Sequence, residues 1–390
     1  MLGHIRFKLL PLMAFAAISG AVLSCTPKAE PETPDVALSL SIKTPAVAGT
    51  KGACFVVVTA PGEWTLGFEE ETDWAELSVL SGKGNKSNVQ LSWTKNAGEK
   101  TRTCTIVLAD SKDTVKAVFS QDGTDPQMSD ELKPDPVANW MELPAVGKGL
   151  YFFSHPMTMP GDSKVLRNYS YAWDIRALVA HWVAYPLNDR LKSGGCGRSD
   201  KWGLDPKVPE KYQPVIYSAF KGNWARGHQI PSADRQVYNY NVQTFYGTNM
   251  TPQNYNMNSG IWSTLENKVR TWSSSFDTLY VVTGCSLEDS PGTSQDNNGK
   301  SVTVPGSYFK ALLGYKKSGT IGKTGAQSGY TSIAFSIPNR DVSGDLIKTY
   351  SMTVEDLERE VGIDFFVNLP AAVGDNTAKK IESTTDSWWK

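Results

Sequence analysis

One of the four histidines in this chain of 390 residues, His228, lies in the stretch RGHQIPSADR between two arginines, Arg226 and Arg235. A histidine can remove a proton from water, and a guanidinium can hold a phosphate group through paired hydrogen bonds. Hydrolysis of a phosphodiester needs both groups, together with a divalent cation that neutralises charge on the phosphoryl oxygens. A lone histidine is more often a structural residue, so this interpretation depends on a metal ligand farther along the chain.

The segment FYGTNMTPQNYNMNSGIWSTLENKVR, residues 245–270, is dense in asparagine and supplies candidate oxygen ligands. Its apolar residues recur at helical spacing, which predicts a helix packed on a core. Asn258 and Glu266 lie on a neighbouring stripe of this helix, eight residues and therefore roughly 12 Å apart along its axis. Both cannot ligate one ion directly at that separation. Asn258 is therefore the predicted metal ligand, and Glu266 is expected to act through metal-bound water.

Magnesium is the predicted ion, because Mg²⁺ prefers oxygen ligands and keeps most of its water shell in a site with few protein ligands. Mn²⁺ or another divalent cation is the alternative. No CxxC pair and no cluster of cysteine and histidine indicates a zinc site. Turn and helix-cap roles are the alternative for the asparagines, and they are our interpretation of Asn254 and Asn256.

The stretch RGHQIPSADR followed by TNMTPQNYNMNSGIWSTLE resembles the DNA/RNA non-specific endonucleases, an endonuclease G-like group with a ββα-metal (His-Me finger) core. The resemblance implies that His228 is the general base, Asn258 the metal ligand and Glu266 a carboxylate beyond the metal's first ligands. Asn249 would support the site, and Arg226 would stabilise the transition state. The sequence distances between His228, Asn258 and Glu266 agree with the family pattern.

Two further arginines are predicted to bind substrate with Arg226. Arg198, in CGRSDKWGLDP, occupies the place of a phosphate-contacting arginine in the family, with Arg190 as the substitute, and Arg235 follows the motif. One position departs from the family pattern, because Ala225 stands where an aspartate usually precedes Arg-Gly-His. We expect this change to adjust metal affinity or the pKa of the histidine and to leave the site active.

The elements that must position these residues follow from the hydrophobic pattern of residues 140–390. Apolar strand patterns occur in YSYAWDI, AHWVAYPL, TLYVVTG, YFKALLGY and TSIAFSIP, and helical patterns occur in NSGIWSTLENKVRTWSSSF and TVEDLEREVG. The sequence therefore predicts an α+β domain with a mixed central sheet flanked by helices, which the resemblance makes the ββα-metal nuclease domain.

Residues 37–123 show a different pattern of short alternating runs separated by turn residues, which predicts an all-β immunoglobulin-like sandwich. Trp64 and Trp74 on either side of a turn, the loop GKGNKSN and the closing VFSQDG resemble the BACON domain of Bacteroidetes surface proteins. That resemblance implies a glycan contact. Trp64 and Trp93 are candidates for stacking on sugar rings, with burial in the sandwich core as the alternative.

Residues 1–24 have the composition of a lipoprotein signal peptide, because basic residues precede an apolar run shorter than the roughly 20 residues of a membrane span. The sequence LSC resembles a bacterial lipobox, so lipidation is predicted at Cys25. Residues 25–36 and 124–139 are rich in proline and acidic residues, as a tether and a linker would be. We expect an exported lipoprotein of the bacterial cell envelope, at the outer membrane or cell surface, with simple secretion as the alternative.

Charge and cysteine content constrain the partners and the covalent structure. The 39 Lys and Arg residues against 40 Asp and Glu residues exclude a strongly basic coat, so the predicted DNA and RNA partners must meet a local patch. Contacts with backbone phosphates alone would weaken with salt. Beyond Cys25, the pairings Cys54 with Cys104 and Cys196 with Cys285 fit the domain division, with free thiols as the alternative.

These features together predict a lipid-anchored, Mg²⁺-dependent, sugar-non-specific endonuclease. The alternative is a catalytically weakened, glycan-binding surface lipoprotein with a nuclease fold, which the BACON-like module and Ala225 favour. A nuclease toxin would need a delivery domain or an immunity partner. The sequence leaves open the oligomeric state and the preference between DNA and RNA.

Overall fold

The computed structural model of the protein describes residues 37–123, 132–319, 329–385 and 388, except residues 48, 50, 97 and 99. The predicted signal peptide 1–24, the tether 25–36 with Cys25, and residues 124–131 of the predicted linker lie outside the described residues. Within the described part of the chain, every helix is too short or too polar to cross a membrane.

The first part of the chain folds into two β-sheets that enclose one core. The strands are β1 (Ser39–Ile42), β2 (Ala46–Val47), β3 (Gly52–Thr59), β4 (Glu63–Phe68), β5 (Ala75–Leu77), β6 (Ser81–Lys83), β7 (Lys86–Trp93), β8 (Arg102–Ala109) and β9 (Thr114–Gln121). One sheet has the order β1-β3-β7-β5, and the other has the order β2-β9-β8-β4-β6. Alternate residues of both sheets, among them Val56, Leu91 and Ile106, share this core, as expected of a sandwich.

The tryptophans of this sandwich are core residues. Trp64 and Trp93 expose only 3% and 8% of their surface, and the Trp64 indole donates a hydrogen bond to the carbonyl of Gly84 at 2.8 Å. Both rings pack within the same hydrophobic cluster. Sugar stacking by these two side chains is therefore excluded, and the alternative of burial in the core is confirmed.

The second part of the chain is built on a seven-stranded sheet. Its strands are β10 (Tyr151–Thr158), β11 (Val165–Asp174), β12 (Val179–Leu187), β15 (Thr278–Ser286), β18 (Ser307–Lys316), β19 (Gly329–Pro338) and β20 (Ser351–Met352), in this spatial order. Every pairing in the sheet is antiparallel. The prediction of a mixed sheet was therefore wrong, because the pattern of a single strand does not give the direction in which it pairs; even β12 and β15, which are separated by helices in the sequence, pair antiparallel.

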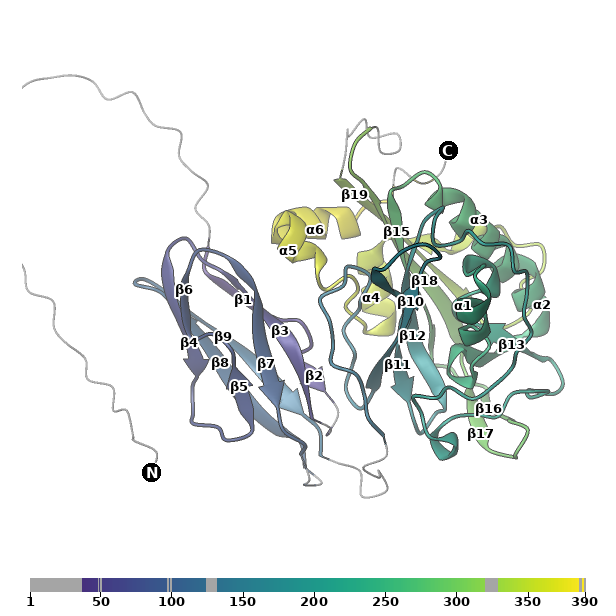
Figure 1. Ribbon diagram of the computed structural model, residues 1–390, viewed down its shortest axis with the longest axis horizontal. Helices are drawn as coiled ribbons and strands as arrows, with labels where there is room; N and C mark the ends of the chain where they lie inside the picture. Colours follow the sequence, from purple (N-terminus) through teal and green to yellow (C-terminus); the bar gives the residue numbers. More distant parts are fainter. Residues whose placement is uncertain are drawn as a thin grey trace, which may run out of the picture. The chain divides into compact units, whose positions relative to one another are not determined.

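Helices cover both faces of this sheet (Figure 1). On one face lie α1 (Tyr238–Gln243), α2 (Tyr255–Met257) and α3 (Ser263–Ser273), and on the other lie α4 (Val354–Val361), α5 (Leu369–Val373) and α6 (Asp375–Glu382). Alternation along the strands divides the core accordingly. Tyr171 and Trp173 contribute to the cluster that contains α3, whereas Ala172 and Trp182 contribute to the cluster under α4 to α6. The first face carries the residues of the predicted site.

The four described cysteines are all free thiols. Cys54 and Cys285 are buried, and burial raises the pKa of Cys54 to about 12 and that of Cys285 well above its usual value. Cys196 is exposed. Both predicted disulfides are thus absent, and the alternative of free thiols holds, although Cys196 is not a core residue.

Candidate active site

A two-stranded ribbon holds the predicted base. Strand β13 (Trp224–His228) pairs antiparallel with β14 (Met250–Asn254), so that His228 lies opposite Met250. Because side chains alternate along a strand, Arg226 and His228 project from the same face of β13. Gly227 between them is required sterically, since a Cβ atom there would lie 2.3 Å from Oε1 and 2.6 Å from Cβ of Gln253. The ribbon and the helix that follows it form the ββα unit expected from the sequence.

The imidazole of His228 is held edge-on by two aromatic rings. Its centroid lies 5.7 Å from that of Trp202 and 5.0 Å from that of Phe245. The ring forms a hydrogen bond with the backbone of Arg226, whereas Nε2 is shielded from solvent and has no hydrogen-bond partner among the described residues. The bond to Arg226 must therefore use Nδ1 as donor. This tautomer leaves a lone pair on Nε2.

Burial, and to a smaller extent the positive charges of Arg198 and Arg226, lower the pKa of His228 to about 3. The ring is therefore neutral in the ligand-free protein across the physiological range. A neutral imidazole with an unpartnered Nε2 is the form that accepts a proton.

Two arginines share the aromatic platform with His228. The Arg226 guanidinium lies 3.7 Å from the centroid of Trp202, and its Nη1 also donates to two backbone carbonyls of the loop before β13. Arg198 lies 4.9 Å from the centroid of Phe245, pairs with Asp200 at 2.8 Å, and is half exposed. Arg198 and Arg226 are thus brought beside the histidine, as predicted. The platform of Trp202 and Phe245 was missed, although Trp202 lies only four residues after Arg198.

Asn249 supports the site from the interior. It is fully buried; its Nδ2 donates to the carbonyls of Ile230 and Thr244 at 3.0 and 2.8 Å, and its Oδ1 accepts from the Ile230 amide at 2.9 Å. These bonds fix the chain two residues after His228. Its side-chain amide is thus engaged by backbone groups near His228, as a supporting residue would be.

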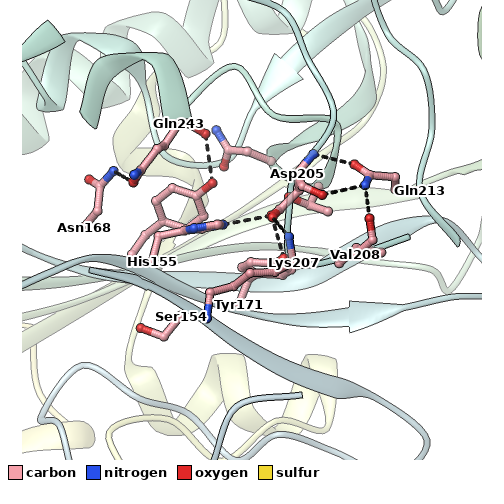
Figure 2. A network of polar contacts seen from close by, with 12 residues as sticks. Ser154, His155, Asn168, Tyr171, Asp205, Lys207, Val208, Gln213 and Gln243 are labelled. Carbon is pink, nitrogen blue, oxygen red and sulfur yellow. Dashed lines mark hydrogen bonds and ion pairs between the residues drawn. The ribbon is translucent and has the colours of Figure 1, made fainter. Parts of the chain in front are cut away.

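A buried carboxylate fixes the loop that carries Trp202 (Figure 2). Oδ2 of Asp205 lies 2.8 Å from Nε2 of His155 and accepts hydrogen bonds from Tyr171 at 2.6 Å and Thr248 at 2.7 Å. Strands β10 and β11, the Trp202 loop and the turn before Asn249 therefore meet at one atom. No role was predicted for Asp205, because the partners of its carboxylate come from three separate segments.

The predicted metal ligand lies where the helix after the ribbon is distorted. Asn258 begins a π-helical turn, η4 (Asn258–Trp262), which Gly260 interrupts with non-helical angles before α3 begins. The 12 Å estimate for a regular helix therefore does not apply between Asn258 and Glu266. The side chain of Asn258 is partly exposed, and no described residue forms a hydrogen bond with its amide.

Glu266 lies in the first turn of α3. Burial raises its pKa to about 7, Lys310 and Arg270 oppose the rise, and Asp234 adds to it. No described residue forms a hydrogen bond or ion pair with its carboxylate. Glu266 is thus a carboxylate that is free to accept hydrogen bonds at the site.

The donor set fits a hydrated hard cation. Among the described residues there is no group of three or more His, Cys, Asp and Glu side chains that would hold a metal. Asn258 nevertheless offers an amide oxygen with no other partner, and Mg²⁺ is bound by few protein oxygens when water supplies the remaining ligands. The residues present therefore fit the predicted Mg²⁺ site and do not fit a transition-metal site with several protein ligands.

Arg235 does not face the candidate site, contrary to its prediction as a substrate-binding residue. It is completely buried, and its guanidinium donates to Oδ1 and the carbonyl of Asn168 at 2.7 and 2.6 Å and to the carbonyls of Asp234 and Pro186 at 2.8 and 3.0 Å. The prediction that Arg235 binds substrate was wrong, because a turn after His228 directs it into the protein. Arg190, the substitute for Arg198, pairs at the surface with Asp162.

Comparisons with known proteins agree with this architecture. The family model described as DNA/RNA non-specific endonuclease matches residues 149–372. A nuclease of Nostoc sp. is 32% identical over 57% of this chain and 78% of its own length. The mitochondrial nuclease EXOG of Danio rerio is 29% identical over 53% of this chain and 61% of its own length, and that of Xenopus laevis is 28% identical over 62% and 68%. The chain thus spans only part of these relatives.

Among solved structures, a chain in the crystal structure of the EndoG/EndoGI complex is similar, with a TM-score of 0.43 and 22% identity. The match covers 55% of this chain and 87% of that chain.

Proposed function

We propose, from the premise that the chain belongs to the DNA/RNA non-specific endonuclease family, that it hydrolyses phosphodiester bonds of DNA and RNA with His228 as general base. The observation that carries this proposal is the state of the His228 ring. Nδ1 is engaged by the backbone, and Nε2 has no partner among the described residues although it is shielded from solvent. A buried polar atom without a partner is costly in a purely structural histidine. Access to Nε2 in the complex requires a small movement of the aromatic platform.

In the reaction, Nε2 of His228 would take a proton from the water that attacks phosphorus in line. Arg226 and Arg198 would hold the phosphate and stabilise the extra negative charge of the transition state. Their charges lower the pKa of His228 in the free protein, in addition to the effect of burial. A bound phosphate offsets those charges, so substrate binding would raise the pKa of His228 and make it a stronger base when it is needed.

Asn258 would hold the divalent cation through its amide oxygen, with Mg²⁺ as the proposed ion. The bound cation would supply charge neutralisation at the scissile phosphate and at the departing 3′ oxygen. Glu266 would accept hydrogen bonds from water at the site and so fix its orientation. None of these steps requires the aspartate that the family usually has at this position and that Ala225 replaces here.

Sugar non-specificity follows from the groups that face the substrate. Arg198 and Arg226 recognise phosphate, which DNA and RNA share, and neither carries information about base sequence. Binding through phosphates alone should weaken steeply as salt concentration rises.

The location of the protein is a separate proposal, because residues 1–36 lie outside the described residues. The basic n-region, the short apolar run and the lipobox-like LSC support export and lipidation at Cys25, with anchoring in the bacterial cell envelope through the lipid alone. The immunoglobulin-like and BACON-like character of residues 37–123 is part of the same proposal. The burial of Trp64 and Trp93 weakens the glycan-binding alternative, since the sandwich loses the two side chains proposed to stack on sugars.

The test compares the wild type with His228→Ala on supercoiled plasmid and on RNA, with Mg²⁺ and with excess EDTA. General-base catalysis is worth about 10²- to 10⁴-fold, so we expect a loss of that size with a nearly unchanged melting temperature. His181→Ala is the matched control, because the His181 ring pairs with Asp174 at 3.2 Å and has no role in the proposed reaction, so this variant should leave the rate unchanged. Asn258→Ala should abolish the response to Mg²⁺.

Cleavage by His228→Ala at the wild-type rate would remove His228 from its role. If the wild type still cleaves in excess EDTA, the proposed role of the divalent cation is wrong. A wild type that binds nucleic acid with Mg²⁺ and cleaves none would establish the alternative of a weakened nuclease fold.

A further inference from the structure

A lysine buried beneath the candidate active site has no part in the mechanism above. Lys310 lies in the middle of β18 and is completely buried. Its ammonium donates one hydrogen bond to Oγ1 of Thr283 at 3.1 Å and lies 4.5 Å from the centroid of the Trp262 ring. No carboxylate among the described residues lies within ion-pair distance of it. A buried ammonium with so few partners is costly unless nearby negative charge compensates it.

Only a few charged groups surround this ammonium. Lys310 interacts electrostatically with Glu266 and Asp234, which are negative, and with Arg270, which is positive. Asp234 is already compensated, because its carboxylate binds Arg270 at 2.9 Å and accepts a hydrogen bond from Tyr185 at 2.8 Å. Glu266 therefore remains as the compensating charge for Lys310.

The sequence of α3 connects this pair to the metal-holding segment. Trp262, the ring on which the ammonium lies, is the last residue of the distorted turn that begins at Asn258, and Glu266 follows one helical turn later. Trp262 is itself almost completely buried and packs edge-on against Tyr308 at 5.6 Å. The ammonium on its face fixes this ring from the side of the sheet, because a cation is attracted to the face of an indole and the attraction is strongest where water is excluded.

We propose that Lys310 is a positioning residue of the active site: its ammonium fixes Trp262 between Asn258 and Glu266, and its charge keeps the Glu266 carboxylate ionised. The inference rests on the proposed function, because an ionised Glu266 is useful only if it accepts hydrogen bonds from water beside the cation. The sheet thus contributes a charge to a site whose other residues come from the ribbon, the helix and the loops.

The acid–base properties of the pair agree with this placement. Burial raises the pKa of Glu266 to about 7, and the largest opposing influence is Lys310, followed by Arg270 and Arg198, whereas Asp234 raises it. Conversely, burial lowers the pKa of Lys310 to about 8, and Glu266 opposes the fall. Removing the ammonium would therefore raise the pKa of Glu266 further, and the fraction of ionised carboxylate near neutral pH would fall.

The first test is the pH dependence of kcat/KM for Lys310→Met, which keeps the length of the chain and removes its charge. The limb on the acid side should move upward by about one pH unit or more, so that activity falls about tenfold below the limb and recovers toward pH 9. Thr283→Val is the matched control. It removes the hydrogen-bond partner and keeps the charge, so the position of the limb should not change.

The double variant Lys310→Met with Glu266→Gln shows whether the lysine acts through the glutamate. If it does, the double variant has the same pH profile as Glu266→Gln alone. A purely structural lysine would instead lower the rate of both backgrounds by the same factor at every pH. Lys310→Gln serves as the second neutral variant if Lys310→Met folds poorly, since its amide can still donate to Thr283.

A measurement without catalysis keeps the two proposals apart. In metal-free protein labelled with ¹³C at glutamate side chains, the Glu266 carboxyl signal is assigned by its loss in Glu266→Gln. Its titration midpoint should rise in Lys310→Met and Lys310→Gln and stay fixed in Thr283→Val. An unchanged midpoint and an unchanged pH profile would overturn the role of Lys310, whereas a wild type without nuclease activity would overturn the proposed function and leave this titration interpretable.

Discussion

Arg235 and Arg198 provide a paired test of which arginine serves the fold and which serves the substrate. Arg235→Met removes four hydrogen bonds, of 2.6 to 3.0 Å, and leaves their carbonyl and amide oxygens buried without donors. Each orphaned acceptor costs about 1–3 kcal/mol, partly offset by relaxation and by relief of the buried charge. We expect the free energy of unfolding to fall by about 3–5 kcal/mol, which is a large part of the total of about 5–15 kcal/mol typical of a folded domain.

Arg198→Ala should have the opposite profile. Its guanidinium is half exposed and its ion pair with Asp200 is a surface pair, so the free energy of unfolding should change by less than about 1 kcal/mol. The KM for DNA should rise, and the slope of log affinity against log salt should fall by about one, as expected when one phosphate contact is lost.

The assay combines urea denaturation with kinetics at a temperature where each variant is folded, and Arg235→Lys retains the charge as a milder change. The reasoning fails if Arg235→Met unfolds like the wild type and instead raises KM or lowers the salt dependence. That outcome would mean that Arg235 turns toward the substrate in the complex, as predicted from its place after the RGH motif.

Two further predictions concern the ribbon. Gly227→Ala would place a methyl group 2.3 Å from Oε1 of Gln253. We expect the free energy of unfolding to fall by about 1–3 kcal/mol, and activity to fall as well because His228 is displaced. A melting curve and a rate equal to those of the wild type would contradict this packing. The ring protons of His228 should not titrate between pH 5 and 8 in substrate-free protein, because burial and then Arg198 and Arg226 lower its pKa to about 3; NMR that shows a midpoint near 6.5 would refute the shielding of Nε2.

Local patterns predicted most of the secondary structure, because strand alternation and helical periodicity are properties of neighbouring residues. The strands YSYAWDI and YFKALLGY lie in β11 and β18, and the helix of TVEDLEREVG is α4. The edge strand β10 was missed, since Pro156 interrupts its pattern and shifts its register after His155. The antiparallel order of the sheet was missed as well, because strand pairing depends on contacts between distant segments.

In the candidate site, too, features that depend on neighbouring residues were predicted and features that depend on distant segments were missed. His228 and Arg226 were predicted together because they lie two residues apart in one motif, and residues at that spacing project from the same face of β13. Arg235 was placed wrongly, since six residues that include a turn separate it from His228 and nothing in the local pattern gives the direction of its side chain. Asp205 and Lys310 were missed, because their roles arise from partners that lie far from them in sequence.

Under the proposed function, these missed residues would explain how a chain with so few histidines keeps its general base at a defined place. A catalytic histidine needs a neutral ring, a fixed tautomer and a nearby positive charge, and these requirements conflict, because the positive charge also weakens the base. In this fold the conflict is resolved by separating the charges in space. Arg198 and Arg226 lie on aromatic rings beside His228, where a substrate phosphate can neutralise them, whereas the charge of Lys310 lies beneath the helix and acts on Glu266. Removing the charge of Lys310 should therefore change mainly the pH profile, whereas removing the charge of Arg198 should weaken mainly the affinity for nucleic acid.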